Sequence, residues 1–218
     1  MTEGERSEGI RIRVVRVRNR RGEGGRLRDE IIDAAAELLD ETGDQHAVTL
    51  RSVARRVGIA TPSIYPHFPD RLAILLAAVQ GEFTGLERAL GAAAEQEVTD
   101  PRRRLLAVCE TYLDFAEHHP QRYRMMFGGL WAPTLEHSSL TETDLVMLGA
   151  PSMLVLVEAL DACVAAGTVA SDHVSADATA LWAGLHGLAH RRIVPPSYSW
   201  PENITERVIL PLARLDAA

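Results

Sequence analysis

The chain has 218 residues and a net charge of −7. It contains no lysine, so its basic residues are arginines and histidines. Hydrophobic residues make up 46% and charged residues 24%, which is ordinary for a globular protein and excludes a wholly disordered chain. No apolar run reaches the ~18 residues that a membrane span needs, and the polar start is not a signal peptide, so we expect a cytoplasmic protein without a membrane partner.

The first segment, residues 1–25, mixes glycines with charges and shows no helical period, so we expect a flexible basic tail. Residues 10–21 hold six arginines and no acid. Such a stretch can be an arm in the minor groove of DNA, or a solvated segment without a binding role. The solvated segment is favoured because four acids share the tail, but whether the tail contacts DNA stays open.

The first two predicted helices lie before a tight turn. Apolar residues at helical spacing predict one helix over 27–43 and another over 49–57. Gly43 ends the first, and Thr49 is a suitable N-cap for the second. Gly58 closes the second helix, so a tight turn is expected to follow it.

A proline-rich piece, residues 61–67, comes after this turn. Pro62 fits the first helical position, where Thr61 can act as the N-cap. Pro66 removes a backbone donor and disfavours helical geometry before it, so we expect a distorted helix of barely two turns. Two short helices joined by a glycine-containing turn form a helix-turn-helix, whose second helix reads base edges in the major groove.

The remaining chain is also predicted to be helical. Asp70 and Asp100 are expected to cap the helices that follow them, and Pro151 is expected to kink or break another. A loop is expected at 132–141. The predicted helical segments are 71–95, 101–119, 120–131, 144–167, 176–194 and 202–216. No series of segments alternates as strands do, so we predict an all-α fold of about nine helices.

The stretch TLRSVARRVGIATPSIYPHFPDRLAIL resembles the DNA-binding signature of TetR-family transcriptional regulators. The residues that match this signature are Gly58, Ile59, Tyr65, His67 and Phe68. Three residues depart from it. Ala60 replaces a common serine, Pro66 replaces a common exposed residue, and Arg71 replaces the usual lysine. The resemblance covers residues 27–76 and implies an N-terminal three-helix helix-turn-helix domain followed by a helical ligand-binding and dimerisation bundle.

Farther along, YLDFAEHHPQRYRMMFG and ALWAGLHGLAHRR resemble the C-terminal domain of a TetR subgroup named for its Trp-His-Gly (WHG) signature, here Trp182, His186 and Gly187. The two resemblances together imply three parts: a tail (1–25), a DNA-binding domain (26–72) and a ligand-binding and dimerisation domain (73–218). They also imply a ligand cavity. The residues expected to contact a small hydrophobic effector are Tyr112, Phe115, Met125, Met126, Trp131, Trp182 and His186, with Tyr112 and His186 as polar anchors.

The DNA contacts are expected in the helix-turn-helix. Phosphates are expected to be bound by Thr49, Tyr65, His67 and Arg71, which would position the protein without reading sequence. Base edges are expected to meet Thr61, Pro62 and Ser63. Arg51 could make either kind of contact. The alternative role for Tyr65 and His67 is packing against the helix over 71–95.

The sequence offers few groups for catalysis or metal binding. Trp182, His186 and His190 share a helix face, and a histidine pair at i, i+4 can bind zinc, but no third ligand is visible. A core histidine beside a packed tryptophan is therefore favoured, with Gly187 letting a neighbouring helix approach. Cys109 and Cys163 lack metal spacing and are expected to be buried free thiols. We expect no metal, no cofactor, no catalytic residue and no enzymatic activity.

One short reading helix contacts too few base pairs for useful specificity, so we expect a homodimer on a palindromic double-stranded operator. Its interface is expected on helices 176–194 and 202–216. Their apolar residues are expected to exceed what one core requires: Leu181, Leu185, Leu188, Val208, Leu210, Leu212 and Leu215. The resulting hypothesis is a repressor that a hydrophobic ligand releases by tilting the helix over 71–95. The same protein could instead activate transcription. The alternative function is a helical small-molecule-binding protein or enzyme without operator-specific DNA binding.

Overall fold

The structure is built along one long helix, α3. The computed structural model describes residues 24–97, 99–128, 133, 135–136, 138–193 and 199–215. In chain order, the helices in these ranges are α1 (Gly24–Thr42), η1 (Gln45–Ala47), α2 (Leu50–Val57), η2 (Thr61–Ser63), α3 (Arg71–Gln96), α4 (Pro101–His118), α5 (Pro120–Phe127), α6 (Glu142–Val146), α7 (Ala150–Ala165), α8 (Val174–Ile193) and α9 (Ile204–Leu212).

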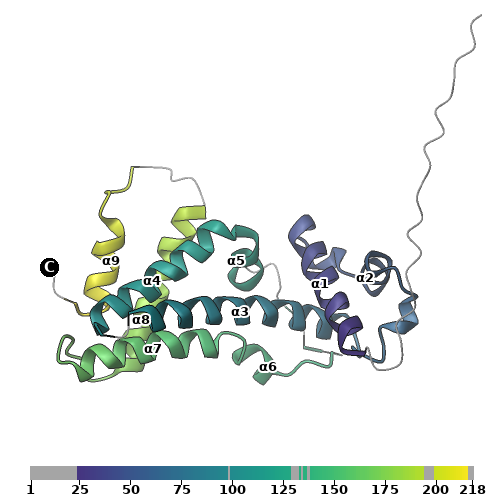
Figure 1. Ribbon diagram of the computed structural model, residues 1–218. Helices are drawn as coiled ribbons and strands as arrows, with labels where there is room; N and C mark the ends of the chain where they lie inside the picture. The colour runs from purple at the N-terminus through teal and green to yellow at the C-terminus, as the bar shows by residue number, and fades with distance from the viewer. Residues whose placement is uncertain are drawn as a thin grey trace, which may run out of the picture.

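The all-α prediction is confirmed, since these ranges contain nine α-helices, two 3-10 helices and no strand. In Figure 1, α1 and α2 lie at one end of α3, and α4, α7, α8 and α9 surround its other end. None of the helices in the described ranges has the length and apolar character required to cross a bilayer. The arginine-rich tail, residues 10–21, lies outside the described residues.

Most of the predicted caps are confirmed. The Thr49 hydroxyl accepts a hydrogen bond from the Ser52 amide at 3.0 Å, and the Ser52 hydroxyl accepts one from the Thr49 amide at 2.8 Å. This reciprocal capping box satisfies two donors at the start of α2. Gly58 ends α2 with φ of 77°, a left-handed conformation that glycine adopts without steric cost. Asp70 and Asp100 cap α3 and α4 as expected.

The proline-rich piece is shorter than a two-turn helix. Only Thr61–Ser63 forms a 3-10 turn, and hydrogen-bonded turns follow it. The prediction that Thr61 caps this piece is wrong, because Ala60 is the N-cap residue and no side chain caps the turn. The amides that a Thr61 hydroxyl could reach are already used: the Ser63 amide donates to Ala60, and the Ile64 amide donates to the Thr61 carbonyl. The predicted distortion is confirmed.

The predicted segment 144–167 is two helices. α6 ends at Val146 and α7 begins at Ala150, so that Pro151 occupies the first turn of α7. Proline lacks the amide that a continuous helix would need at that point, which accounts for the break. The predicted interruption by Pro151 is therefore confirmed, although the break precedes the proline by several residues.

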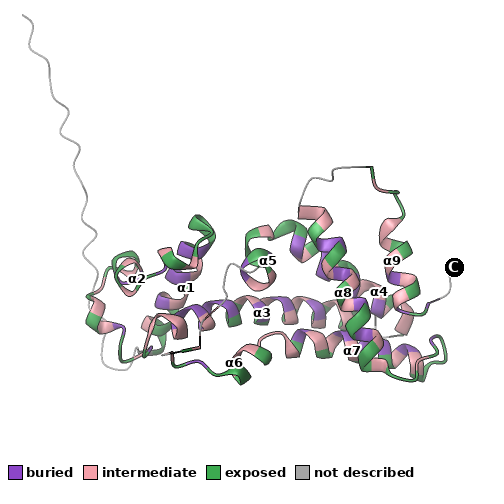
Figure 2. Cartoon of the chain, turned by 180° about the vertical axis from the view of Figure 1, so that it is seen from behind, coloured by how far each residue is buried: buried purple, intermediate pink, exposed green. Residues whose placement is uncertain are grey.

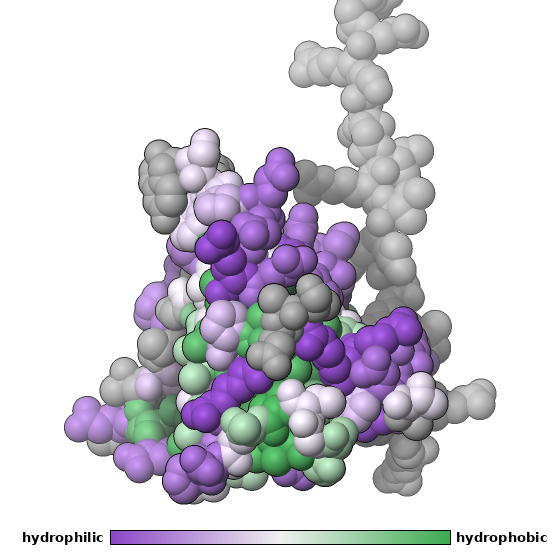
Figure 3. Space-filling view, turned by 90° about the vertical axis from the view of Figure 1, so that its left-hand side faces the viewer, coloured by the Kyte–Doolittle hydropathy of each residue, from purple (hydrophilic) through white to green (hydrophobic). Residues whose placement is uncertain are grey.

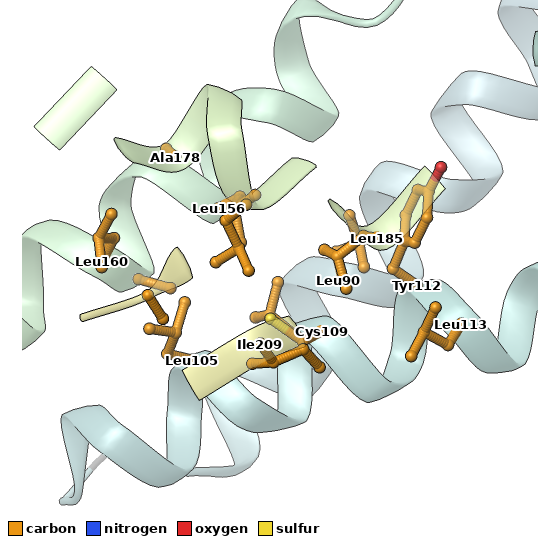
Figure 4. Close-up of a cluster of buried hydrophobic side chains, with 14 of the residues drawn as sticks. Leu90, Leu105, Cys109, Tyr112, Leu113, Leu156, Leu160, Ala178, Leu185 and Ile209 are labelled. Carbon is orange, nitrogen blue, oxygen red and sulfur yellow. The ribbon is translucent and has the colours of Figure 1, made fainter. Parts of the chain in front are cut away.

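Two hydrophobic clusters form along α3. The head cluster joins α1, α2, the turn after η2 and the first half of α3, and the body cluster joins the second half of α3 to α4, α7, α8 and α9. Figure 4 shows part of the body cluster, with Leu105 and Leu160 on one side of Leu156 and with Leu90 beside Leu185 on the other. Figure 2 shows buried residues along most of α3, as expected for a helix covered on several sides. Cys109 and Cys163 are buried free thiols, as predicted.

The packing of α8 against α9 corrects two expectations. The apolar residues considered surplus all lie in the body cluster or pack against it. The argument for a second apolar surface is therefore wrong for the four buried ones, Leu181, Leu185, Leu188 and Leu215, whereas Val208, Leu210 and Leu212 are only partly buried. The close helix approach occurs at Gly184, where an added Cβ would lie 2.4 Å from Leu212 Cδ1 and 3.0 Å from Val208 Cγ1. Gly187 is exposed and would have no such neighbour within 4 Å, so the expectation that a neighbouring helix of the same chain approaches it was wrong.

Candidate DNA-binding surface and ligand cavity

The segment after α2 is held in place by two buried side chains. Ile64 is 0% exposed and Phe68 is 3% exposed, and both belong to the head cluster. The backbone between them is tied down as well, because the amides of His67 and Phe68 both donate to the Ile64 carbonyl. Tyr65 consequently points outward and is 57% exposed. The alternative that Tyr65 packs into the protein is therefore wrong.

The structure places the predicted DNA-contact residues on or near the surface of the head. Thr49, Arg51, Pro62 and Tyr65 are exposed, whereas Thr61, Ser63, His67 and Arg71 are partly buried. They occupy the end of the molecule formed by α2, η2 and the start of α3 (Figure 1). Their contacts with DNA stay a prediction.

Two of these residues already have structural partners. The Thr49 hydroxyl belongs to the capping box of α2. The guanidinium of Arg71 donates to the Gln45 carbonyl at 2.8 Å, which ties the start of α3 to η1. A guanidinium has five donors, so this bond leaves others available for a phosphate. Arg71 thus has a positioning role in the free protein that its sequence position did not reveal.

The neighbouring arginines of α2 differ in electrostatic environment. Arg56 bonds Glu41 at 2.6 Å and Glu37 at 2.9 Å, and these carboxylates raise the pKa of Arg56. Arg51 and Arg55 are exposed and form no ion pair with any residue that the structure describes. Arg51 and Arg55, at i and i+4 of α2, therefore present unpaired positive charge to the solvent.

A cavity of about 530 Å³ lies between α3, α5, α6, α7 and α8. The residues that line it are Phe83, Met126, Phe127, Pro133, Leu145, Val146, Leu148, Gly149, Ala150, Met153 and Trp182. No side chain in this lining is ionisable. Such a cavity suits a drug-sized apolar molecule.

Sequence reasoning identified Met126 and Trp182 of this lining and missed the others. Phe83 looks like an ordinary apolar position of a long helix. The residues of α6 and of the connection to α7 lie in a segment with a helical apolar period. Such a period predicts packing in a hydrophobic core and does not predict the lining of a cavity. A signal was present in Pro151, because a break in a helix opens room for a cavity wall.

The other predicted ligand contacts lie elsewhere. Tyr112 and His186 lie behind the lining, with ring centroids 4.9 Å from Trp182 and 4.6 Å from Phe127, respectively. Phe115 packs beside His119, and Met125 is buried in the head cluster. Trp131 lies outside the described residues. Direct contact of these five with a ligand stays a prediction.

The partly buried His186 and the buried Tyr112 and Tyr123 form a polar group behind the cavity. His186 Nδ1 lies 2.9 Å from the Trp182 carbonyl, so the nitrogen that carries the proton there donates to it. The Tyr112 hydroxyl lies 3.2 Å from Nδ1 and 3.4 Å from Nε2, and with the proton on Nδ1 it is Nε2 that can accept a hydrogen bond from this hydroxyl. Burial lowers the pKa of His186 and raises the pKa of the Tyr112 and Tyr123 hydroxyls. The group is therefore uncharged at neutral pH.

The lowered pKa of His186 predicts a loss of stability in acid. Unfolded histidine has a pKa of about 6.5, so below that pH the unfolded chain binds a proton that the native protein resists. The free energy of unfolding should fall as pH drops from about 8 to about 5, by up to about 1.4 kcal/mol per pH unit from this residue. Urea unfolding across that range should show a smaller fall for His186→Gln.

His190→Gln is the matched control, since His190 is exposed on the same helix. It should keep the pH dependence of the wild type. An identical pH dependence for wild type and His186→Gln would contradict the assignment of a neutral, buried imidazole.

α5 contacts both the cavity and the head. Met126 and Phe127 line the cavity, while the preceding residue, Met125, is buried in the head cluster. α5 packs against α1, α3 and α4, and Arg122 forms an ion pair with Glu82 of α3 at 3.6 Å. A displacement of α5 at the cavity wall would therefore change its packing against α1.

Within the described part of the chain, no three His, Cys, Asp or Glu residues are grouped so that they could hold a metal ion. The two α8 histidines predicted on one face have different surroundings, because His190 is exposed and His186 is packed among rings.

Two sequence models of protein families match the chain. The one described as "Bacterial regulatory proteins, tetR family" matches residues 31–78, which include α2, η2 and most of α1. The one described as "Tetracyclin repressor-like, C-terminal domain" matches residues 105–210, from α4 to α9. Together the two matches extend over most of the described helices.

A curated relative and two solved structures are similar to the chain. The relative is the HTH-type transcriptional activator FasR of Mycolicibacterium smegmatis, 35% identical over 100 residues, which are 46% of this chain and 45% of FasR. The chain thus spans about half the length of the curated relatives it matches.

The first structure is a protein of unknown function from Rhodococcus sp. RHA1, with a TM-score of 0.72, 25% identity, and coverage of 90% of this chain and 98% of that one. The second is a bacterial regulatory protein in the tetR family from Rhodococcus RHA1, with a TM-score of 0.61 and 20% identity, covering 86% and 95%. The second similarity supports the fold alone.

Proposed function

The chain belongs to the TetR family of DNA-binding bacterial regulators, and we propose that it is a repressor that leaves a palindromic operator when a small hydrophobic ligand binds. The observation that carries this proposal is the position of the apolar cavity. Its walls include α3 and α5, and both helices also pack into the head that presents η2 and Tyr65. The subgroup named for Trp182, His186 and Gly187 stays a prediction.

We propose the division into a DNA-binding part, residues 26–72, and a ligand-binding and dimerisation part, residues 73–218. The two hydrophobic clusters support such a division. The parts share α3, because this helix runs without interruption from Arg71 to Gln96 and contributes to both clusters. A displacement of α3 at the cavity would therefore also move the head.

The proposed homodimer uses α8 and α9. Small exposed residues follow one another along α8, and an added Cβ at Gly187 would meet no atom within 4 Å. The exposed small residues of α8 are Ala176, Ala180, Ala183 and Gly187. Figure 3 shows an apolar area with hydrophilic margins at the end of the molecule near α9 and the α7–α8 connection. A two-fold axis there would place two heads on successive major grooves.

The proposed response to ligand is a shift in the population of two arrangements. A ligand among Phe83, Met126 and Phe127 would favour one position of α3 and α5 relative to α1. That position would change the separation of the two η2 segments in the dimer and lower operator affinity. Coupling of this kind is typically about 1–3 kcal/mol.

We place this activity in the cytoplasm, where its operator DNA would be. FasR is named an activator, so the sign of regulation is a separate part of the proposal. A reporter gene behind the operator decides it, because deletion of this regulator should raise expression if it represses.

The proposed function is tested by selection of duplexes from a random library with the purified chain, followed by footprinting. We expect one palindrome whose half-sites lie about 34–36 Å apart, together with a dimer at micromolar concentration. Recovery of no preferred sequence would contradict the proposal and favour a helical small-molecule-binding protein or enzyme without operator-specific DNA binding.

A further inference from the structure

An arginine outside the quoted helix-turn-helix signature lies against Phe68, the last of the residues that match it. The guanidinium carbon of Arg28, in the second turn of α1, stands 5.0 Å from the centroid of the Phe68 ring. Phe68 is the buried residue that ends the segment carrying Tyr65 and His67. We infer that Arg28 is a further phosphate-binding residue of the head, and that the Phe68 ring holds its guanidinium in place.

The other arginines of the head show why Arg28 stands out. Arg26, in the same helix, pairs with Glu30 at 3.1 Å. Arg56 is shared between two carboxylates of α1, and Arg71 is bonded to a backbone carbonyl. Arg28 is exposed and has no carboxylate within ion-pair distance among the residues described. Its full charge is therefore available to an outside anion.

Stacking on a ring suits this role. A guanidinium held by its face keeps its donors at the edges, where a phosphate can accept two hydrogen bonds at once. The ring also limits the side-chain freedom that a free arginine would lose on binding. Because Phe68 is fixed in the head cluster, the guanidinium has a defined position relative to the recognition segment.

The location agrees with a contact to the DNA backbone. Figure 1 shows the first turns of α1 beside the chain that connects η2 to α3. Tyr65, three residues before Phe68, is exposed on the same connection. Three peptide units span at most about 11 Å, so the phosphates of a duplex that contacts Tyr65 would lie within reach of Arg28. A contact there would add affinity without sequence preference.

The alternative role for Arg28 is purely structural, because its aliphatic stem covers part of an aromatic ring. Methionine can also cover the ring but carries no charge, so Arg28→Met separates the two roles. Arg26→Met is the matched control, since it removes a guanidinium that is already paired within the same helix.

The inference rests on the proposed DNA-binding function, and the experiment measures affinity for the selected duplex and for a scrambled duplex as salt is raised. Each phosphate contact contributes about 0.9 to the slope of log affinity against log salt. Loss of two contacts per dimer should make the fall in affinity between about 50 and about 200 mM salt about 12-fold smaller. Arg28→Met should show this change on both duplexes, and Arg26→Met should keep the wild-type slope.

If Arg28→Met keeps the wild-type slope of log affinity against log salt, the inference is overturned. The inference is also overturned if the variant binds more weakly with an unchanged slope and unfolds at a lower temperature, because the loss of affinity then comes from loss of stability. In both cases the wild-type protein still selects its operator, so the proposed function stands. Wild-type protein that binds neither duplex contradicts the proposed function and the inference together.

Discussion

Combining Arg51→Glu with Ser63→Glu is expected to lower affinity for the selected operator by about 1,000-fold or more. Arg51 is exposed on α2 without an ion-pair partner in the described chain, and Ser63 ends η2 at the edge of the head. Lost contacts of about 1–3 kcal/mol at two positions, in both protomers, sum to at least about 4 kcal/mol. The new carboxylates would also repel the phosphates.

The measurement is a titration of labelled operator duplex at fixed salt, with thermal unfolding as the check on folding. Arg103→Glu is the control, since Arg103 is exposed on α4, far from η2 along the chain, and makes only a surface pair with Glu97. Such a pair contributes about 0–1 kcal/mol, so the control should fold and bind like the wild type. Unchanged affinity in the double variant would disprove the assignment of α2 and η2 to DNA.

Met153→Trp is expected to reduce binding of an uncharged apolar dye, such as Nile red, by about 10- to 100-fold. Met153 lines the cavity from α7, and a larger ring at that position occupies the space that the dye needs. Overpacking of a filled core costs about 1–3 kcal/mol, but here the added volume enters a cavity of about 530 Å³. Operator affinity without ligand should therefore stay within about 3-fold of the wild type, roughly 0.7 kcal/mol.

The adjacent residue supplies a close control. Leu154 is 54% exposed on the other side of α7, so Leu154→Trp adds the same ring outside the cavity. Fluorescence titration should give wild-type dye affinity for Leu154→Trp. Equal dye affinity in all three proteins would show that small apolar molecules bind elsewhere, and would remove the cavity from the proposed mechanism.

The helix boundaries followed from short-range features of the sequence. Thr49, Gly58, Asp70 and Asp100 were recognisable as caps because each satisfies, or ends, hydrogen bonds with residues within about four positions. Pro151 predicted an interruption for the same reason, since a missing amide is a local property. The matched TetR signature added the arrangement of the first three helices.

Local reasoning failed where several groups competed for the same partner. Thr61 was expected to cap η2, but backbone carbonyls had already taken the available amides. Arg55 and Arg56 are equivalent as neighbours in sequence, whereas only Arg56 meets the carboxylates of α1. The choice depends on which side of α2 faces α1.

Contacts between distant helices determined the remaining features. Gly184, and not Gly187, lies under α9, and Met125 turns toward the head while Met126 turns toward the cavity. A helical period indicates that a face is buried, but it does not say against what. The sequence by itself thus determined the all-α class, most of the helix caps and the position of the exposed reading segment, because these depend on neighbours in the chain. Only the tertiary structure decided the cavity lining and the partner of each arginine, because those depend on the rotation and packing of helices far apart in sequence.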